Sequence, residues 1–330
     1  GGFVLVGVVF SIIAIIVGYI GIGWINKLFP PAAMGSIITL IGLELAGTAA
    51  DMAGFPVGGS NSPTLNVSWV IVSMVTLLTV ILCNVLLRGF LKVIPLLIGV
   101  IVGYITSYFM GIVDFSLVSN ASFFVLPNIK IAHFNINAIL TILPATFVVI
   151  AEHVGHLKVT SSIVGKDFLE DPGLHRSLLG DGLSTIVSGM FGSVPTTTYG
   201  ENIGVMALTK IYSVYIICGA GLISIILGFS GKMSALIRTI PTPVIGGVSF
   251  LLFGTIAVSG LRTFIEEKVD FSKSRNLILS SVIFIVGISG ITLTMGSFEI
   301  TGMGLATIVA IILNLSFIIF DKLGLMNEKE

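Results

Sequence analysis

The chain is a succession of apolar runs, most of them long enough to cross a lipid bilayer. A helix needs about 20 apolar residues to span the hydrocarbon layer. This criterion predicts spans over residues 3–21, 30–50, 66–87, 91–112, 136–157, 174–191, 200–211, 212–230, 241–260, 274–291 and 300–320. Only 10% of the 330 residues are charged, against about 25% in a soluble globular chain. We therefore expect an all-α polytopic membrane protein.

The basic residues favour one side of the membrane. If Arg88 and Lys92 face the cytoplasm, alternation of the spans places 13 of the 16 Lys and Arg residues inside. Cytoplasmic loops carry such an excess of basic residues, so we expect the C-terminus in the cytoplasm. The remaining basic residues, expected outside, are Lys130, Lys232 and Arg238. The formal charge of +0 gives no indication of nucleic-acid binding.

Residues 193–210 are atypical of a spanning helix. Ser193–Tyr199 is rich in hydroxyl and β-branched side chains and contains a proline, which favours a short strand. Gly200 then allows a turn, and Glu201 opens a short helix. Non-helical backbone is tolerated at membrane depth only where protein or a water-filled cavity covers it. A strand followed by a half-helix with an acid at the break is typical of a transporter's substrate site.

Four carboxylates, those of Glu44, Glu152, Asp181 and Glu201, lie within apolar runs. An acid at this depth costs a few kcal/mol and is a candidate functional residue by default. Glu201 is expected at the N-terminus of the half-helix, where the helix dipole favours its charge and burial opposes it. For Glu44, a scaffold hydrogen bond and a coupling role fit equally well. For Asp181, between two glycines, a functional role and stabilisation of a helix start are equally compatible.

Glu152 and His156 have the i,i+4 spacing that places two side chains on one face of a helix. Gly155 leaves room there for a small planar ligand or a close helix. A buried Glu beside a His is suited to relay a proton, and the alternative is a structural hydrogen-bonded pair. His153 is expected to point towards another helix.

The residue patterns suggest neither an enzyme nor a resident metal or cofactor. Cys83 and Cys218 are far apart within separate apolar runs, and neither a zinc-binding helix nor a phosphate-binding glycine loop with a lysine is visible. We also find no nucleophile–base pair typical of a hydrolase. The carboxylates within the apolar runs suggest a coupling ion, H⁺, and no cofactor.

Two spans open in a similar way. Pro30 and Pro31 with Gly35 begin one span, and Pro241 and Pro243 with Gly247 begin another. A mid-span glycine follows each, at positions 42 and 254. The two copies are seven crossings apart, so they enter the membrane from opposite sides, as inverted repeats do.

Residues Glu201 to Lys210 resemble the signature of the nucleobase–ascorbate transporter family. That signature is an acidic residue, Gln or Pro, then Asn, any residue, Gly, four residues, Thr, and Arg, Lys or Gly. Every fixed position matches. The segments 151–157, 171–176 and 30–35 resemble the same family, and in particular its uracil-transporting bacterial branch.

The resemblance implies a fold of fourteen spans in two inverted repeats of seven, divided into a core and a gate domain. On that template the chain has about eleven spans and begins at the fourth, so we expect a fragment whose missing third span supplies the strand that pairs with Ser193–Tyr199. The core domain would comprise 1–29 and 136–230, and the gate domain 30–135 and 231–330. A homodimer through the gate domain is a further expectation.

The resemblance also implies proton-coupled uptake of a nucleobase, with uracil expected first. Glu152 and Glu201 would hold the base, the backbone of Tyr199 and Gly200 would line it, and His156 would partner Glu152 in proton coupling. Support is expected from Asn202 and Asp181, and contacts from the gate domain at Ser249 and Phe253. The alternatives are a purine permease for xanthine or urate on the same scaffold, and an anion transporter of the same fold.

Overall fold

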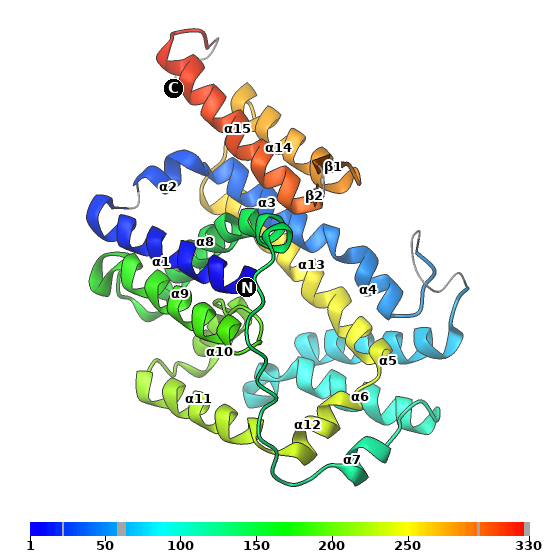
Figure 1. The fold of residues 1–330 in the computed structure, drawn as a ribbon. Coiled ribbons are helices and arrows are strands. Elements are labelled where there is room, and N and C mark those ends of the chain that lie inside the picture. The colour runs from blue at the N-terminus through cyan, green and yellow to red at the C-terminus, as the bar shows by residue number, and fades with distance from the viewer. Residues whose placement is uncertain (22, 58–63, 296–297, 327–330) are drawn as a thin grey trace. The chain divides into compact units, whose positions relative to one another are not determined.

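The structure is a computed structural model that describes the chain except residues 22, 58–63, 296–297 and 327–330 (Figure 1). Helices make up most of it, and one antiparallel hairpin is formed by β1 (Thr292–Met295) and β2 (Phe298–Thr301). The α-helices are α1 (Gly2–Ile20), α2 (Gly23–Leu28), α3 (Pro31–Glu44), α4 (Ala46–Met52), α5 (Val67–Leu86), α6 (Pro95–Phe109), α7 (Ser116–Asn120), α8 (Ile136–Val164), α9 (Leu174–Met190), α10 (Gly200–Thr209), α11 (Val214–Gly228), α12 (Gly231–Arg238), α13 (Thr242–Glu266), α14 (Ser274–Ile288) and α15 (Gly302–Lys322). A 3₁₀ turn over Gly89–Val93 and a π-helical turn over Leu169–Gly173 join neighbouring helices.

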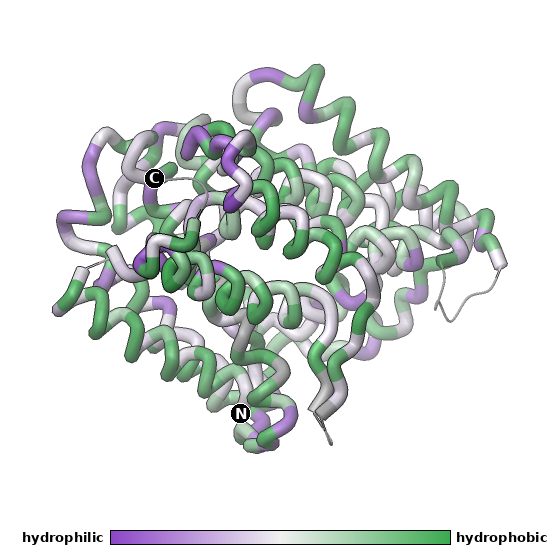
Figure 2. Tube along the Cα trace, turned by 90° about the horizontal axis from the view of Figure 1, so that it is seen from above, coloured by the Kyte–Doolittle hydropathy of each residue, from purple (hydrophilic) through white to green (hydrophobic). Residues whose placement is uncertain are grey.

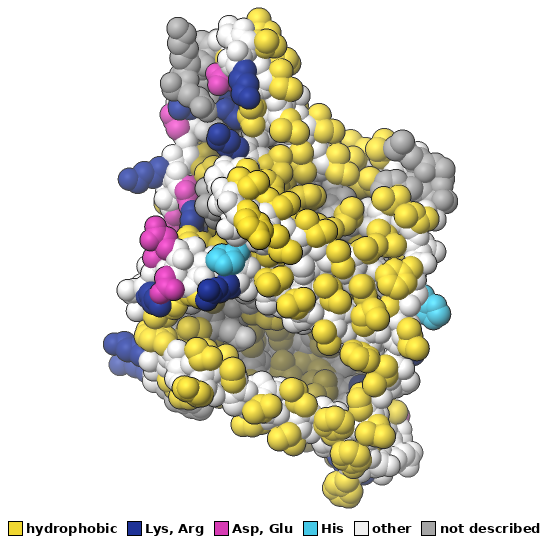
Figure 3. All heavy atoms as spheres, turned by 60° about the vertical axis from the view of Figure 1, so that its left-hand side comes forward, with side chains coloured by type: hydrophobic (Ala, Val, Ile, Leu, Met, Phe, Trp, Pro, Cys, Tyr) yellow, Lys and Arg dark blue, Asp and Glu magenta, His cyan; other side chains and the backbone are white. Residues whose placement is uncertain are grey.

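Every predicted span coincides with one helix or, for 30–50, with the consecutive helices α3 and α4, which divide at Leu45. Among the described residues, five helical segments are long and apolar enough to cross a membrane, and three shorter helices are also apolar. Figure 2 shows hydrophobic residues along most turns of the helices, and in Figure 3 hydrophobic side chains cover most of the visible face. These features are those of an integral, multi-pass membrane protein.

Helix α8 is longer than its predicted span because its two ends are separately capped. The Asn135 side chain accepts hydrogen bonds from the backbone N–H groups of Asn137 and Ala138, which satisfies the helix start. At the other end, Gly165 adopts φ +77°, the left-handed conformation that commonly terminates helices. The helix therefore continues through residues 158–164, which the apolar pattern assigns to a loop.

The chain forms two compact units. The first comprises residues 1–44, 129–203 and 256–330, and the second residues 45–128 and 204–255. The unit boundaries fall between α3 and α4, after Asn128, within α10 and within α13. These units are defined by internal packing. Their boundaries differ from those of the predicted core and gate domains, and that division stays a prediction.

In the first unit, α1 packs closely along α9 (Figure 1). Glycines allow this approach, since a Cβ on Gly7 would lie 2.6 Å from the carbonyl oxygen of Gly182. Around this contact, buried residues of α1, α8 and α9 form a core cluster that includes Phe10, Val154 and Leu178. The cluster fixes α8 against α9, the two helices that carry most of the predicted polar residues.

A second core cluster in this unit joins α3, α14 and α15 around Leu40, Leu279 and Ala306. Beside it, the Glu44 carboxylate accepts a hydrogen bond from the backbone N–H of Met303 at 2.8 Å, in the first turn of α15. An acceptor at that position satisfies a backbone donor that has no partner within the helix. This hydrogen bond supports the scaffold role of Glu44, and the coupling role stays a prediction.

The second unit is held by the pairing of α5 with α6 and by polar contacts between its loops. The Ser73 hydroxyl donates to the carbonyl oxygen of Ala53 within the buried interior. At the ends of the helices, Tyr104 and Thr239 share a hydrogen bond of 2.7 Å, and the Lys232 ammonium donates to the carbonyl oxygen of Val118 at 2.7 Å. The contact of Lys232 with Val118 joins two loops predicted on the outer side.

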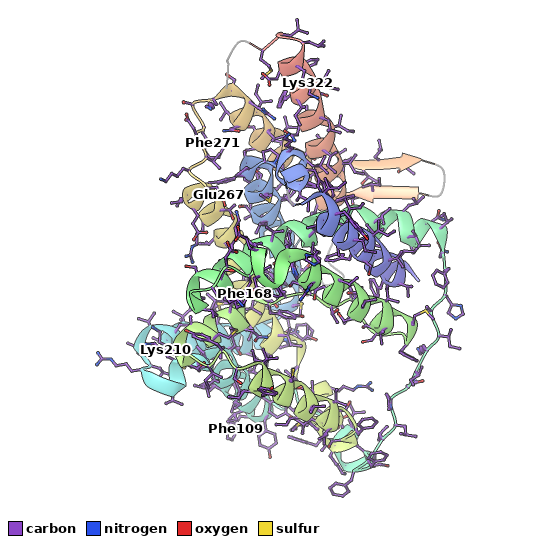
Figure 4. The ribbon with its side chains drawn as sticks, turned by 90° about the vertical axis from the view of Figure 1, so that its left-hand side faces the viewer. Phe109, Phe168, Lys210, Glu267, Phe271 and Lys322 are labelled. Carbon is purple, nitrogen blue, oxygen red and sulfur yellow. The ribbon has the colours of Figure 1, made fainter. Side chains whose placement is uncertain are left out.

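In the first unit, two further polar contacts join segments that are distant in sequence. Lys158 and Glu267 form an ion pair at 2.9 Å between the ends of α8 and α13. Asn314 donates to the carbonyl oxygen of Lys27 at 2.7 Å. Figure 4 labels Glu267, which follows α13, and Phe168, which follows α8. Alternation of the predicted spans places the loops that contain Lys158 and Glu267 on the same side of the membrane, whichever side is cytoplasmic.

The segment Ser193–Tyr199 is not a β-strand, contrary to expectation. Among the described residues, strand structure is confined to β1 and β2, at 292–301, and to an isolated bridge between Phe124 and Ser230. The reason is that a strand requires a neighbouring backbone to complete its ladder. Here the extended segment takes hydrogen bonds from hydroxyl side chains of α9 instead, as described below.

Candidate functional site

Glu152 and His156 lie on one face of α8, as their spacing predicts. The Glu152 Oε1 and His156 Nε2 atoms are 3.9 Å apart. Their side chains are partly accessible, at 28% and 19%. This separation is longer than a direct hydrogen bond but within the range of electrostatic interaction. The pair therefore combines an acid and an imidazole that solvent or a ligand can reach.

The segment between α9 and α10 contacts the imidazole of His156. The Nδ1 atom of His156 lies 2.8 Å from the Thr198 hydroxyl oxygen. On the other side of the ring, a Cβ on Gly200 would lie 3.1 Å from Nε2. The absence of a side chain at Gly200 thus lets the start of α10 approach the histidine closely. The helix start, the acid and the imidazole come together in the first unit.

His153 points away from this pair and is buried, with 1% of its side chain exposed. Its Nδ1 lies 2.7 Å from Asp181 Oδ2, and its Nε2 lies 2.7 Å from the Ser177 hydroxyl. Both partners belong to α9. The structure therefore confirms that His153 faces another helix, and it shows Asp181 bound to that histidine rather than stabilising a helix start.

Hydroxyl side chains of α9 hold the extended segment that leads into the site. The Thr185 hydroxyl donates to the carbonyl oxygen of Thr196 and accepts from its backbone N–H at 3.1 and 3.2 Å. Ser188 donates to the carbonyl oxygen of Val194, and Ser184 bonds the Thr196 side chain. These contacts satisfy backbone groups that would otherwise be costly at membrane depth.

Helix α10 begins at Gly200, one residue before Glu201, which the sequence predicts to open the half-helix. Glu201 is therefore in its first turn, but the Glu201 side chain lies outside the described residues. Asn202 is exposed, and Tyr199 is exposed at 64%. Their backbone surrounds the N-terminus of α10, where N–H groups lack partners within the helix.

Ser249 and Phe253, predicted to contribute from the gate domain, lie on the part of α13 that belongs to the second unit. Ser249 is buried, with 6% exposure, and Phe253 is partly buried. Their participation in the site stays a prediction.

Two contacts of the site were not expected from the sequence, namely Thr198 with His156 and Ser177 with His153. Ser177 is one of many hydroxyl residues in an apolar helix, and nothing in the pattern distinguishes it. Thr198 had a faint signal, since Thr196-Thr197-Thr198 is an unusual concentration of hydroxyl groups beside the half-helix. The sequence does not show that this run of threonines lies next to α8.

Chemically, the site offers a carboxylate, an imidazole and the N–H groups of a helix start, which have no partner within the helix. A carboxylate accepts N–H donors when ionised, and donates as well when it is protonated. The imidazole can hold or release a proton near neutral pH. The set suits a small planar ligand with both N–H and C=O groups, and the movement of a proton with it.

The comparisons with known proteins agree with a transporter. The sequence profile described as Permease family matches residues 1–296. A protein named uracil permease from Paenibacillus larvae subsp. larvae is 56% identical over 328 residues, which are 99% of this chain and 78% of that protein. The uracil permease of Escherichia coli K12 is 55% identical over 317 residues, 96% of this chain and 73% of that protein. The uracil permease of Bacillus subtilis 168 is 45% identical over 322 residues, 95% of this chain and 74% of that protein.

Proposed function

The chain belongs to the nucleobase–ascorbate transporter family, and from that premise we propose that it imports uracil together with a proton by alternating access. Membership in this family makes the chain a transporter and not an enzyme. The observation that carries the proposal is the pairing of Glu152 with His156 against the glycine that opens α10.

Uracil is the proposed substrate because relatives that share about half of this chain's residues carry that name. Its ring presents N–H donors and C=O acceptors on one planar rim. An ionised carboxylate of the Glu152 and Glu201 pair would accept N–H groups of the base, and a protonated one would accept one hydrogen bond and donate another. The backbone N–H groups at the start of α10 would meet a carbonyl oxygen. A purine substrate is not favoured by these relatives, and paired acids would repel an anion.

Proton coupling is proposed from the same residues. A carboxyl that must be protonated before the base fits would make substrate binding depend on proton binding. His156, 3.9 Å from Glu152, is placed to exchange that proton. No cofactor is required, and the driving force is the proton gradient alone.

The remaining proposals concern how the molecule is arranged in the cell membrane. We propose that the C-terminus is cytoplasmic, on the basis of the basic residues expected inside. Segments 1–29 and 136–230 would form the core domain, with Asn202 and Asp181 supporting the site. Segments 30–135 and 231–330 would form the gate domain, in an inverted-repeat fold, with a homodimer through the gate. Ser249 and Phe253 would then contact the base from the gate.

The test is uptake of radiolabelled uracil by the product of the full-length gene in proteoliposomes with an imposed inward proton gradient. Uptake should stop on addition of a protonophore, should persist when sodium is replaced by choline, and should fall at least tenfold in Glu152→Ala and Glu201→Ala. Excess unlabelled uracil should compete, whereas xanthine and urate should not. Uptake that ignores both the protonophore and the two substitutions would reject the proposal.

A further inference from the structure

The Thr198 side chain stands on the opposite edge of the His156 ring from Glu152. One ring nitrogen, Nδ1, lies 2.8 Å from the Thr198 hydroxyl oxygen. The other, Nε2, is directed to Glu152 Oε1 at 3.9 Å and to the backbone at Gly200. The two nitrogens of the same ring therefore face different groups, and the hydroxyl of Thr198 is the one that meets Nδ1.

The groups that face the two ring nitrogens of His156 differ in their hydrogen-bonding capacity, and this difference favours one tautomer of the neutral ring. An ionised carboxylate accepts hydrogen bonds only, whereas a hydroxyl can donate or accept. Glu152 therefore favours a proton on Nε2 of the neutral ring, and Thr198 can then donate its O–H to Nδ1. When the ring gains a second proton at Nδ1, the same hydroxyl can turn and accept it. Both protonation states are paired without any movement of the ring.

From this geometry we propose that Thr198 is a positioning residue for proton coupling. Its hydroxyl holds neutral His156 with the proton on Nε2, so that the coupling proton binds at Nδ1. Thr198 itself need not touch the base. The inference rests on the proposed function, because it assigns a role in the proton step of uracil import.

Glu152 faces His156 from the same helix, and Tyr199 follows Thr198 in the extended segment. The acid of α9, Asp181, is engaged by His153 instead. From α10, Glu201 follows Gly200, although its side chain lies outside the described residues. A substitution at Thr198 removes a hydroxyl and no charge, so it tests the hydrogen bond alone.

The neighbouring threonine provides a matched control. The Thr197 hydroxyl is buried and has no hydrogen-bond partner among the described residues. Replacing an unpaired buried hydroxyl by a methyl group is close to neutral or stabilising. Thr197→Val and Thr198→Val make the same chemical change one residue apart, and the two sites differ in that Thr198 meets the histidine.

The direct test is ¹⁵N NMR of the full chain in lipid nanodiscs, with the four histidines labelled on their ring nitrogens. The His156→Asn variant assigns the His156 signals by their loss. At alkaline pH we expect wild type to show a protonated Nε2 and an unprotonated Nδ1. Thr198→Val should show a mixture of both tautomers, whereas Thr198→Ser and Thr197→Val should resemble wild type.

The second readout is the pH dependence of uracil binding by the same samples. The Thr198 hydroxyl pairs with both protonation states of His156, so its removal displaces the pH profile by the difference between the two hydrogen bonds. The bond to the charged ring is the stronger one, and we expect a displacement towards lower pH of about half to one pH unit. We expect that displacement in Thr198→Val and recovery in Thr198→Ser. If Thr198→Val does not fold, Thr198→Ala removes the same hydroxyl and replaces it in both measurements.

The outcomes separate this inference from the proposed function. A wild-type ring protonated on Nδ1, or a Thr198→Val ring with the wild-type tautomer and pH profile, would overturn the positioning role. A wild-type chain that binds no uracil at any pH would instead overturn the proposed substrate, and the NMR result would still decide the role of Thr198.

Discussion

His153 on α8 and Asp181 on α9 are joined by a 2.7 Å contact between Nδ1 and Oδ2, in a position where the histidine is only 1% exposed. An ionised carboxylate can only accept, so the Nδ1–H group of His153 donates to Asp181 when that acid is ionised. Ser177 completes the arrangement at Nε2. A buried, fully paired imidazole of this kind links the helix that carries Glu152 to the helix that supports the extended segment.

Removal of this link should destabilise the protein. A hydrogen bond to a charged group contributes about 1.5–3 kcal/mol, and loss of one partner leaves the other unpaired. We expect His153→Ala and Asp181→Ala each to lower the free energy of unfolding by roughly that amount. Ser177→Ala, which removes a neutral partner, should cost about 1 kcal/mol. Denaturant-induced unfolding in detergent micelles would measure all three, and equal stabilities across the set would contradict the assignment.

Glu44 should matter for stability and not for coupling, because its carboxylate caps α15. Loss of a cap acceptor costs about 0.5–2 kcal/mol, so Glu44→Ala should lower the melting temperature. Glu44→Gln keeps an acceptor oxygen and should recover most of the loss. Proteoliposomes that contain Glu44→Gln should still take up uracil in response to a proton gradient. Loss of coupling in a stable Glu44→Gln protein would restore the alternative role.

The close contact of α1 with α9 should tolerate no side chain at position 7. The Cβ of Gly7→Val would lie against the backbone carbonyl of Gly182, which cannot move independently of its helix. Overpacking of this kind costs about 1–3 kcal/mol or more. Gly180→Ala is the matched control, since a Cβ there meets no atom within 4 Å. That control should be neutral or stabilising by up to about 1 kcal/mol, because Ala favours helix. Thermal unfolding of the two variants tests the difference.

The ion pair between Lys158 and Glu267 should contribute little to stability despite its 2.9 Å separation. The two side chains are 45% and 35% exposed, and exposed pairs are worth about 0–1 kcal/mol. A double-mutant cycle with Lys158→Ala and Glu267→Ala should therefore give a coupling energy below about 1 kcal/mol. The coupling should decrease further in high salt. A coupling above 2 kcal/mol would show that water is excluded from the pair.

Several features followed from the sequence by itself because their causes are local. The positions of the helices follow from apolar runs long enough to cross a membrane. The shared face of Glu152 and His156 follows from the 3.6-residue period of one helix, and the start of α10 at Gly200 follows from the change in composition there. In each case the residues that decide the structure are near neighbours in the chain.

The tertiary structure alone decided which polar groups meet. Thr198 and His156 are 42 residues apart, His153 and Asp181 are 28 apart, and Glu44 and Met303 are 259 apart. The sequence left the roles of Glu44 and Asp181 open, and it predicted a strand where the extended segment bonds α9 instead. A change of a few tenths of an ångström between donor and acceptor is enough to weaken a hydrogen bond. The positions of these atoms are set by how the helices pack, through side chains that are distant in sequence.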